Sequence, residues 1–366
     1  MQGQIKALNF EGQNIYVGID VHLKSWSVTV LTTHITHKTF SQAADAGALY
    51  NYLQAHFPGA TYHSAYEAGF SGFWLHYQLL EMGINNIVIN AADVPTNQKE
   101  KTQKTDAVDS RKIARSLRSG ELTALYVPPV STLSDRSLVR TRLTLVKDMS
   151  RFKQRIKSFL YFNGVDYPEE FSNKSVHWSK RFVKWLRSIQ LDYPTATQSL
   201  NVLVDQLEGQ RKYLLEMTRK IRALSQSEKY ARNITLLRSI PGIGPVTAIS
   251  LLTELASIER FSNTDRLAGY IGLVPKCHSS GDNDNKGEMT FRTNKHLLHL
   301  LIESSWFAVR HDPALGLCYS QYIRRMDENK AIIRITRKLV NRIYVVLKTE
   351  KEYICGIEVN QSKGKL

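Results

Sequence analysis

The distribution of apolar and polar residues over the first third of the chain predicts alternating strands and helices. Short apolar runs rich in β-branched residues predict strands, and apolar residues recurring every three or four positions predict helices. Thr105 can cap the last of these helices and Gly120 can end it. In chain order we predict three strands, a helix, a strand, a helix, a strand and a helix, at 15–20, 26–32, 37–40, 43–57, 61–66, 70–82, 86–90 and 105–120.

This βββαβαβα order predicts an α/β domain of the RNase H-like class. In that architecture the first and fourth strands lie side by side, and the final helix crosses over them. The rigid break Val127-Pro128-Pro129-Val130 predicts where the domain ends. We therefore assign residues 1–127 to it.

The rest of the chain has mostly helical periodicity. Long amphipathic helices are expected at 132–162 and 196–226, where they could form an antiparallel coiled-coil arm or an oligomer contact. We assign 128–230 to a basic helical arm and 231–366 to a mostly α C-terminal domain.

The segment Leu236–Ala248 contains Pro-Gly-Ile-Gly between two helical stretches and predicts a helix-hairpin-helix. Gly242 and Gly244 would let backbone N–H groups approach a phosphate at the start of the second helix, where Pro245 suits the first turn. A purely structural turn is the alternative interpretation.

A formal net charge of +16 indicates a polyanionic partner, and nucleic acid is the favoured class. Between residues 136 and 157 the helix expected at 132–162 concentrates this charge against the single acid Asp148, which predicts contact with a phosphate backbone rather than an ordinary solvated face. A second stretch, 178–187, interleaves tryptophans with cations and could stack on unpaired bases or contribute to a core. The cations on the helix that we expect to bind nucleic acid are Arg140, Arg142, Lys147, Arg151, Lys153, Arg155 and Lys157.

No apolar run is long enough for a transmembrane helix, and the first residues lack the apolar core of a signal peptide. The three cysteines are far apart and have no CxxC spacing, so neither a disulfide framework nor a zinc site is expected. We therefore predict a cytoplasmic protein with no membrane partner.

Four carboxylates in the first domain are candidate metal ligands. Asp20 and Glu67 each end an apolar strand, and Asp106 and Asp109 are three apart on one helix face. Acids gathered in this way repel each other unless cations lie between them, which predicts a divalent-metal site of the phosphodiester-cleaving kind.

The C-terminal domain offers a candidate nucleophile in a polar loop expected at 276–285. Ser279 and Ser280 precede Gly281 there, close to basic side chains. Such a loop is usually only a turn. A serine nucleophile needs activation, and no general base can be assigned, because nothing orients the adjacent His278.

These motifs together resemble the transposases of insertion sequence family 110, with its 1111 branch and the Piv-type DNA invertases. The resemblance rests on Gly-Ile-Asp at Asp20, Tyr-Glu-Ala-Gly at Glu67, and Lys-Thr-Asp-Ala-Val-Asp at Asp106 and Asp109. It also rests on the Pro-Gly-Ile-Gly hairpin and the Gly-Leu-Val-Pro…Ser-Gly segment, and it runs from about residue 14 to residue 350.

The resemblance implies a RuvC-like domain whose DEDD tetrad, Asp20, Glu67, Asp106 and Asp109, binds Mg²⁺. It further implies that Ser280, or Ser279 in the doublet, becomes covalently joined to DNA. Members of the family act as dimers and tetramers with composite active sites, and a structured bridge or seeker RNA pairs with donor and target DNA. The implied function is therefore RNA-guided DNA transposition through a phosphoserine intermediate.

Three alternatives to this function stay open at this point. A DNA invertase of the same family would use the same chemistry on an invertible segment. A metal-dependent, junction-resolving nuclease would hydrolyse DNA with water and make no use of Ser280. A non-enzymatic nucleic-acid scaffold is disfavoured by the presence of all four acids.

Overall fold

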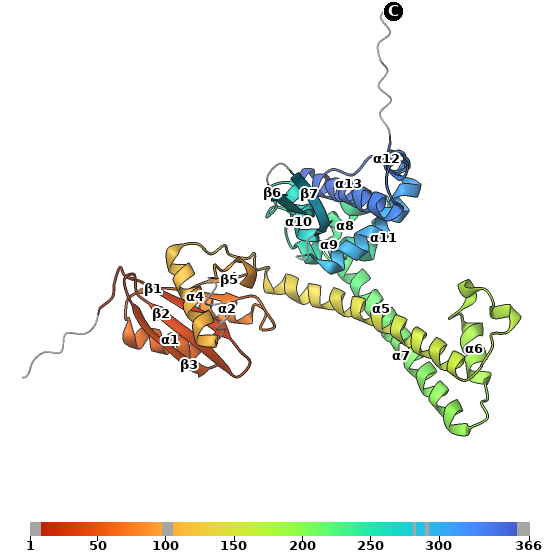
Figure 1. Ribbon diagram of the computed structural model, residues 1–366, viewed down its shortest axis with the longest axis horizontal. Helices are drawn as coiled ribbons and strands as arrows, with labels where there is room; N and C mark the ends of the chain where they lie inside the picture. The colour runs from red at the N-terminus through yellow and green to blue at the C-terminus, as the bar shows by residue number, and fades with distance from the viewer. Residues whose placement is uncertain (1–8, 97–104, 281–282, 290–292, 357–366) are drawn as a thin grey trace, which may run out of the picture. The chain divides into compact units, whose positions relative to one another are not determined.

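The computed structural model describes residues 9–96, 105–280, 283–289 and 293–356, with the backbone alone at 275–280 and 283–289. The chain forms two compact units that meet between Val127 and Pro128 (Figure 1). The predicted boundary at residue 230 falls inside the second unit.

The first unit is built on a mixed five-stranded sheet with the order β3-β2-β1-β4-β5. Strands β1 to β3 are antiparallel, and β4 and β5 run parallel to β1. The first and fourth strands are thus neighbours, as predicted, in a sheet compatible with an RNase H-like domain. The strands are β1 Asn14–Val21, β2 Ser25–Leu31, β3 Thr36–Ala43, β4 Thr61–Glu67 and β5 Asn85–Ile89.

Alternation along β1 divides the packing between the two faces of this sheet. Ile15, Val17 and Ile19 are fully buried in a core that includes residues of helices α1 (Ala46–His56) and α2 (Trp74–Glu81). The intervening residues face the opposite side, because successive strand residues alternate. Helix α4 crosses that side.

Helix α4 (Asp106–Ser119) begins and ends where the sequence predicts. The Thr105 side chain accepts a hydrogen bond from the backbone N–H of Val108, and Gly120 ends the helix in the left-handed conformation with φ +75°. Ser110 of α4 is fully buried on the side of the helix that faces the sheet, and its hydroxyl lies 2.9 Å from Thr29 Oγ1 of β2. Small polar residues therefore let the helix pack closely on the sheet.

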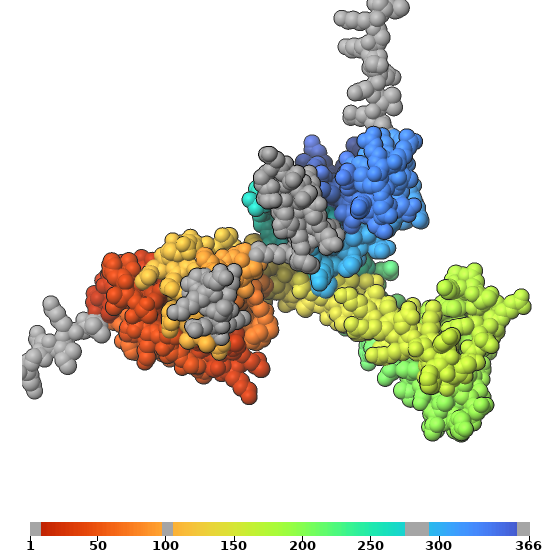
Figure 2. All heavy atoms as spheres, viewed as in Figure 1, coloured from red at the N-terminus to blue at the C-terminus, as the bar shows by residue number. Residues whose placement is uncertain are grey.

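The second unit contains the predicted antiparallel helix pair, α5 (Val130–Phe162) and α7 (Pro194–Ser225). Met149, Ile156 and Leu160 of α5 share a core with Leu200, Val204 and Leu207 of α7. Helix α6 (Lys180–Ser188) contributes Phe182, Val183 and Leu186 to the same core. Figure 2 shows this arm as a projection coloured from yellow to green.

The rest of the second unit is a helical bundle with its own core. The helices are α8 Ala231–Arg238, α9 Pro245–Leu255, α10 Thr264–Ile271, α11 Lys295–His311, α12 Pro313–Ile323 and α13 Glu328–Thr349. Helix α9 is buried along most of its length, and α13, which packs against α8, α10, α11 and α12, buries Ile335, Leu339 and Ile343 in the same core. Among the described residues, no helix is both long and apolar enough to cross a membrane.

The predicted polar loop at 276–285 is wrong. Residues Pro275–Ser280 form strand β6, which pairs antiparallel with β7 (Asn283–Met289). Ser, Asn, Asp and Gly have low strand propensity, so the local sequence favours a loop. Here pairing between the two segments, with Cys277 opposite Lys286, gives the strands.

Candidate active site

The ends of two neighbouring strands position the first two acids. The parallel register of β1 and β4 pairs Ile19 with Tyr66, so Asp20 and Glu67 are the next residues on adjacent strands. Asp20 lies on the same face of β1 as Gly18, the face that α4 covers. Both carboxylates are partly buried.

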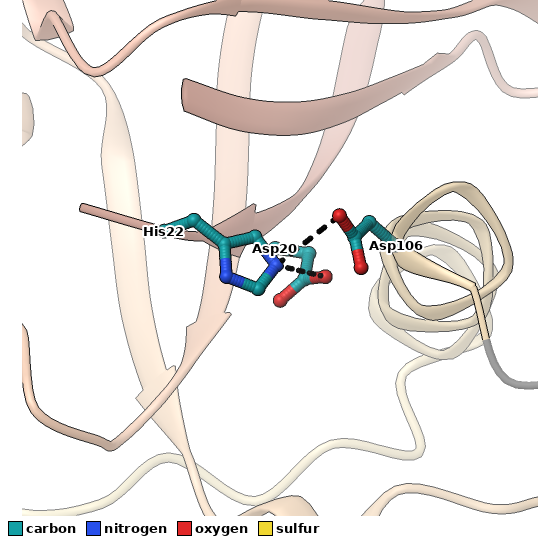
Figure 3. Close-up of side chains that lie close together, drawn as sticks. All are labelled: Asp20, His22 and Asp106. Carbon is teal, nitrogen blue, oxygen red and sulfur yellow. Dashed lines mark hydrogen bonds and ion pairs between the residues drawn. The ribbon is translucent and has the colours of Figure 1, made fainter. Parts of the chain in front are cut away.

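The first turn of α4 carries Asp106 to the Asp20 carboxylate. His22 Nε2 lies 3.2 Å from Asp20 Oδ2 and 3.4 Å from Asp106 Oδ2, so one imidazole contacts both acids (Figure 3). Ligand atoms of the three side chains all lie within 4.8 Å of one another. The structure thus brings together two of the predicted acids and a histidine that the sequence interpretation missed.

Asp109 lies one helical turn further along and has a cation of its own. Lys112 Nζ is 2.9 Å from Asp109 Oδ1, and both side chains are largely buried. Burial raises the pKa of the Asp20 carboxyl; the charge of His22 opposes this shift, and the charges of Asp106 and Asp109 add to it. The three acids therefore repel one another through space, which is the electrostatic situation that a bound cation relieves.

The donor set fits a divalent cation. Carboxylate oxygens suit Mg²⁺ and Mn²⁺, and imidazole nitrogen is also a common ligand of divalent first-row metals. Asp20 lies near the end of β1 and Asp106 in the first turn of α4, so regular structure fixes the backbones of both acids, and His22 is the first residue after β1. Such a site can hold a cation at the edge of the sheet.

The candidate nucleophile Ser280 ends β6 in the second unit, opposite Asn283 of β7, and Ser279 pairs with Asp284. Their side chains, together with Gly281, lie outside the described residues. Asn294, which caps α11, donates through its backbone N–H to the carbonyl of Tyr270 at 3.3 Å.

The segment predicted as a helix-hairpin-helix forms α8, a short turn and α9, and its two glycines have different environments. Gly242 has φ +91°, and a Cβ there would lie 2.3 Å from the Ser304 carbonyl oxygen of α11. Glycine is therefore required at 242 by the packing of the turn, which is the structural alternative left open by the sequence. Gly244 is the N-cap of α9, and a Cβ there would meet nothing within 4 Å.

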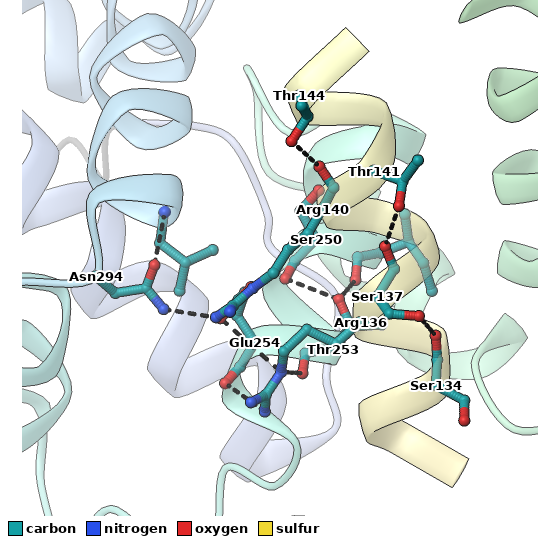
Figure 4. Close-up of polar contacts among 12 residues, drawn as sticks. Ser134, Arg136, Ser137, Arg140, Thr141, Thr144, Ser250, Thr253, Glu254 and Asn294 are labelled. Carbon is teal, nitrogen blue, oxygen red and sulfur yellow. Dashed lines mark hydrogen bonds and ion pairs between the residues drawn. The ribbon is translucent and has the colours of Figure 1, made fainter. Parts of the chain in front are cut away.

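The basic helix α5 uses its first cations to attach to α9. Arg140 forms two hydrogen bonds with Glu254, from Nε to Oε1 at 2.6 Å and from Nη2 to Oε2 at 2.8 Å (Figure 4). The Glu254 side chain is only 1% exposed. Arg136 Nε donates to the Thr253 carbonyl at 2.9 Å, and Asn294 Nδ2 donates to Glu254 Oε2 at 2.9 Å. Arg140 therefore has a structural partner that the sequence did not indicate.

Further along α5, four of the predicted nucleic-acid-binding cations have partners within the arm, and Arg155 is one of them, over the Phe152 ring at 5.1 Å from its centroid. Arg142 Nε donates to Thr218 Oγ1 of α7 at 3.0 Å. Lys153 and Lys157 lie over the Trp178 ring, with Nζ 5.7 and 5.9 Å from its centroid. Trp178 and Trp185 are both partly buried against the arm core. The tryptophans thus pack within the arm.

Three of the predicted cations further along α5, Lys147, Arg151 and Arg155, are exposed. Arg151 Nη1 lies 2.9 Å from Asp148 Oδ1, and the Arg151 side chain is 68% exposed. An exposed pair of this kind contributes little to stability and leaves the guanidinium accessible. These side chains form the accessible cationic surface of α5.

Two family profiles match this chain. One, described as "Transposase" and of the DEDD type found in IS110 elements, matches residues 17–163, which include all four predicted acids. The other, described as "Transposase IS116/IS110/IS902 family", matches residues 234–320, which include the α8–α9 turn and Ser280. The chain belongs to the IS110 family of DEDD transposases.

Curated proteins of similar sequence carry related names. The chain is 27% identical to y4qE of Sinorhizobium fredii, named as a candidate transposase, over 87% of this chain and 77% of that protein. It is 24% identical to the transposase for insertion sequence element IS1111A of Coxiella burnetii, over 70% of each. It is also 29% identical to the pilin gene-inverting protein of Moraxella bovis, over 32% of this chain and 38% of that protein.

For this IS110-family transposase, the DEDD-type domain implies use of a divalent metal, and the cluster at Asp20, His22 and Asp106 is where the described residues could hold one. His22 follows Asp20 by two positions, directly after β1 ends at Val21. That spacing was the signal available in the sequence.

Proposed function

We propose that this transposase cuts and rejoins DNA through a covalent bond to Ser280, with Mg²⁺ at the acid cluster and a structured RNA selecting the sites. The observation that carries the proposal is the convergence of Asp20, Asp106 and His22 within a DEDD-type domain. The four acids of the tetrad, Asp20, Glu67, Asp106 and Asp109, would hold the metal. When bound, Mg²⁺ would polarise the scissile phosphate and stabilise the leaving oxygen.

In the proposed reaction, Ser280 Oγ attacks the scissile phosphorus and forms a serine–phosphate ester. The P–O bond to the leaving strand breaks, and the leaving oxygen takes up a proton as the serine loses its own. A hydroxyl of the incoming strand then attacks the same phosphorus and releases the serine. The phosphodiester energy is conserved, so strands are resealed without ATP.

The accessible cations of the arm support a nucleic-acid role. Lys147, Arg151 and Arg155 are exposed on α5, on a chain whose formal net charge is +16. Gly244 at the start of α9 leaves room for a phosphate beside backbone N–H groups, as helix N-termini allow. Backbone contacts of this kind carry no sequence information, so pairing with a guide RNA would supply the choice of site.

The covalent step is tested by incubating the protein and its copurified RNA with element-end DNA and Mg²⁺, then separating products under denaturing conditions. The parent should give a protein–DNA adduct, Ser280→Ala should give none, and Ser279→Ala should retain it. The Asp20→Asn, Asp106→Asn double variant should also lose the adduct. Cleavage by Ser280→Ala equal to that of the parent would favour the nuclease alternative.

RNA guidance is tested in the same reaction. Sequencing the copurified RNA should identify one structured species, and its removal with RNase should abolish adduct formation on element ends. Unchanged reaction after complete RNA removal would overturn this part of the proposal.

The invertase alternative is favoured by one specific observation, the similarity to a pilin gene-inverting protein. A plasmid carrying two inverted copies of the cleaved site distinguishes the two outcomes. Transposition predicts joining of element ends to a separate target, whereas inversion predicts a flipped intervening segment.

A charge reversal on the arm tests the nucleic-acid surface. Arg151→Glu with Arg155→Glu is expected to weaken RNA or DNA binding by about 10-fold or more at low salt, because two exposed cations become anions. The loss should shrink as salt rises. Fluorescence anisotropy across a salt series measures it, and Arg151→Lys with Arg155→Lys, which keeps the charge, is the matched control. Equal affinity of both double variants at every salt concentration would contradict the assignment.

A further inference from the structure

We propose that His22 is a metal ligand, so that the site of this transposase is a mixed nitrogen–oxygen site and not an all-carboxylate one. The inference rests on the proposed metal-binding function and adds a residue outside the DEDD tetrad. Its consequence is selectivity: the site favours imidazole-binding divalent metals such as Co²⁺ over Mg²⁺ more strongly than a tetrad of acids would.

The positions of the donor atoms support this assignment. Ligands about 2.1 Å from a common cation lie about 3.0 Å apart when adjacent and about 4.2 Å apart when opposite, if the coordination is octahedral. His22 Nε2 is 3.2 Å from Asp20 Oδ2 and 3.4 Å from Asp106 Oδ2. These separations match adjacent ligands of one ion, with the imidazole directed at both carboxylates (Figure 3).

The position of His22 in the chain also favours a ligand role. Asp20 lies near the end of β1, His22 is the first residue after that strand, and Asp106 approaches from the first turn of α4. Two of the three donors thus belong to regular elements, and the third directly follows one of them. The His22 side chain is 47% exposed, so its substitution should leave the buried core intact.

The chemistry of the donors predicts how metals are ranked. Mg²⁺ prefers oxygen ligands and keeps several of its waters, so it gains little from an imidazole. Co²⁺ binds imidazole well. A histidine ligand should therefore increase the affinity for Co²⁺ much more than the affinity for Mg²⁺. A histidine that only forms ion pairs with the acids should change both affinities alike.

The test measures binding of metals to the full-length, chelator-treated protein in the absence of DNA. Co²⁺ is followed by its visible absorption, and Mg²⁺ by competition against it. His22→Ala is expected to weaken Co²⁺ binding by about 10-fold or more and Mg²⁺ binding by less than about 3-fold. His22→Asp, which replaces nitrogen with oxygen, should restore Mg²⁺ binding without restoring Co²⁺ preference.

Two controls separate this inference from the proposed function. His34→Ala, an exposed histidine in the turn before β3, should leave both affinities unchanged and reports surface binding of Co²⁺. Asp20→Asn with Asp106→Asn should lose both metals. Equal effects of His22→Ala on Co²⁺ and Mg²⁺ would overturn the ligand role, and failure of the parent to bind either metal would overturn the metal site as well.

Discussion

Glu254→Ala is expected to lower the free energy of unfolding of the second unit by about 3–5 kcal/mol. The Glu254 carboxylate is 1% exposed, and it accepts both hydrogen bonds of the Arg140 fork. Arg136, whose side chain is 12% exposed, lies 3.9 Å from the same carboxylate. Removing the acid would leave two guanidinium groups facing each other with no anion between them.

The consequence would extend beyond α9, because this carboxylate connects three segments. Glu254 belongs to α9, Arg136 and Arg140 belong to α5, and Asn294 is the N-cap of α11 (Figure 4). We therefore expect Glu254→Ala to loosen both the attachment of the arm to α9 and the start of α11, which Asn294 caps. Glu254→Gln should lower the free energy of unfolding by less, since glutamine keeps the shape of the side chain and some of its hydrogen bonds.

Urea denaturation followed by circular dichroism measures the loss. The matched control is Glu259→Ala: Glu259 pairs with Lys348, but its side chain is 72% exposed. An exposed pair contributes about 0–1 kcal/mol. Equal destabilisation by Glu254→Ala and Glu259→Ala would show that the buried network stabilises the second unit no more than an exposed ion pair does.

The same network predicts a pH dependence of known sign. Burial alone would raise the pKa of Glu254, but the hydrogen bonds and charge of Arg140, with Asn294 and Arg136, outweigh burial and lower it. A lowered folded-state pKa means that the stabilisation is present above the ordinary glutamate pKa of about 4.3 and is lost as the pH falls below it. The stability difference between the parent and Glu254→Gln should therefore shrink in that acid range.

Local patterns in the sequence predicted the first unit well, because its strands and helices follow regular periodicity. The ends of β1 and β4 and the capped start of α4 could all be predicted from the sequence, and they place Asp20, Glu67 and Asp106. The strand hairpin β6–β7 could not be predicted. Its sequence favours a loop, and the pairing of Ser279 with Asp284 depends on the partner strand.

Long-range contacts explain what else the sequence could not reveal. Arg140 and Glu254 are 114 positions apart, so a cationic helix face gave no sign that one of its arginines pairs with a buried acid. Asp109 was predicted as a metal ligand, and its contact with Lys112 is local. The contacts of His22 could be predicted only in part. Its spacing from Asp20 is evident in the sequence, but its contact with Asp106 follows only from the packing of α4 on the sheet.

That packing depends on Gly18, and Gly18→Ala is expected to destabilise the first unit by about 3 kcal/mol, the upper end for overpacking. A Cβ at this position would lie 2.1 Å from the Ser110 carbonyl oxygen and 2.4 Å from the Ala114 nitrogen. Both are backbone atoms of α4, so no side-chain rotation can relieve the clash. The helix would have to move away from β1.

Displacement of α4 would carry Asp106 and Asp109 away from Asp20, so Gly18→Ala should also weaken metal binding although it removes no ligand. Amide hydrogen exchange should report lower protection along α4, and the Co²⁺ titration should report the weaker site. Gly69→Ala is the matched control, because a Cβ there would meet nothing within 4 Å. If α4 exchanged as slowly in Gly18→Ala as in Gly69→Ala, close packing at Gly18 would not be what holds the acids together. If α4 loosened and metal affinity stayed unchanged, the site would not depend on the helix.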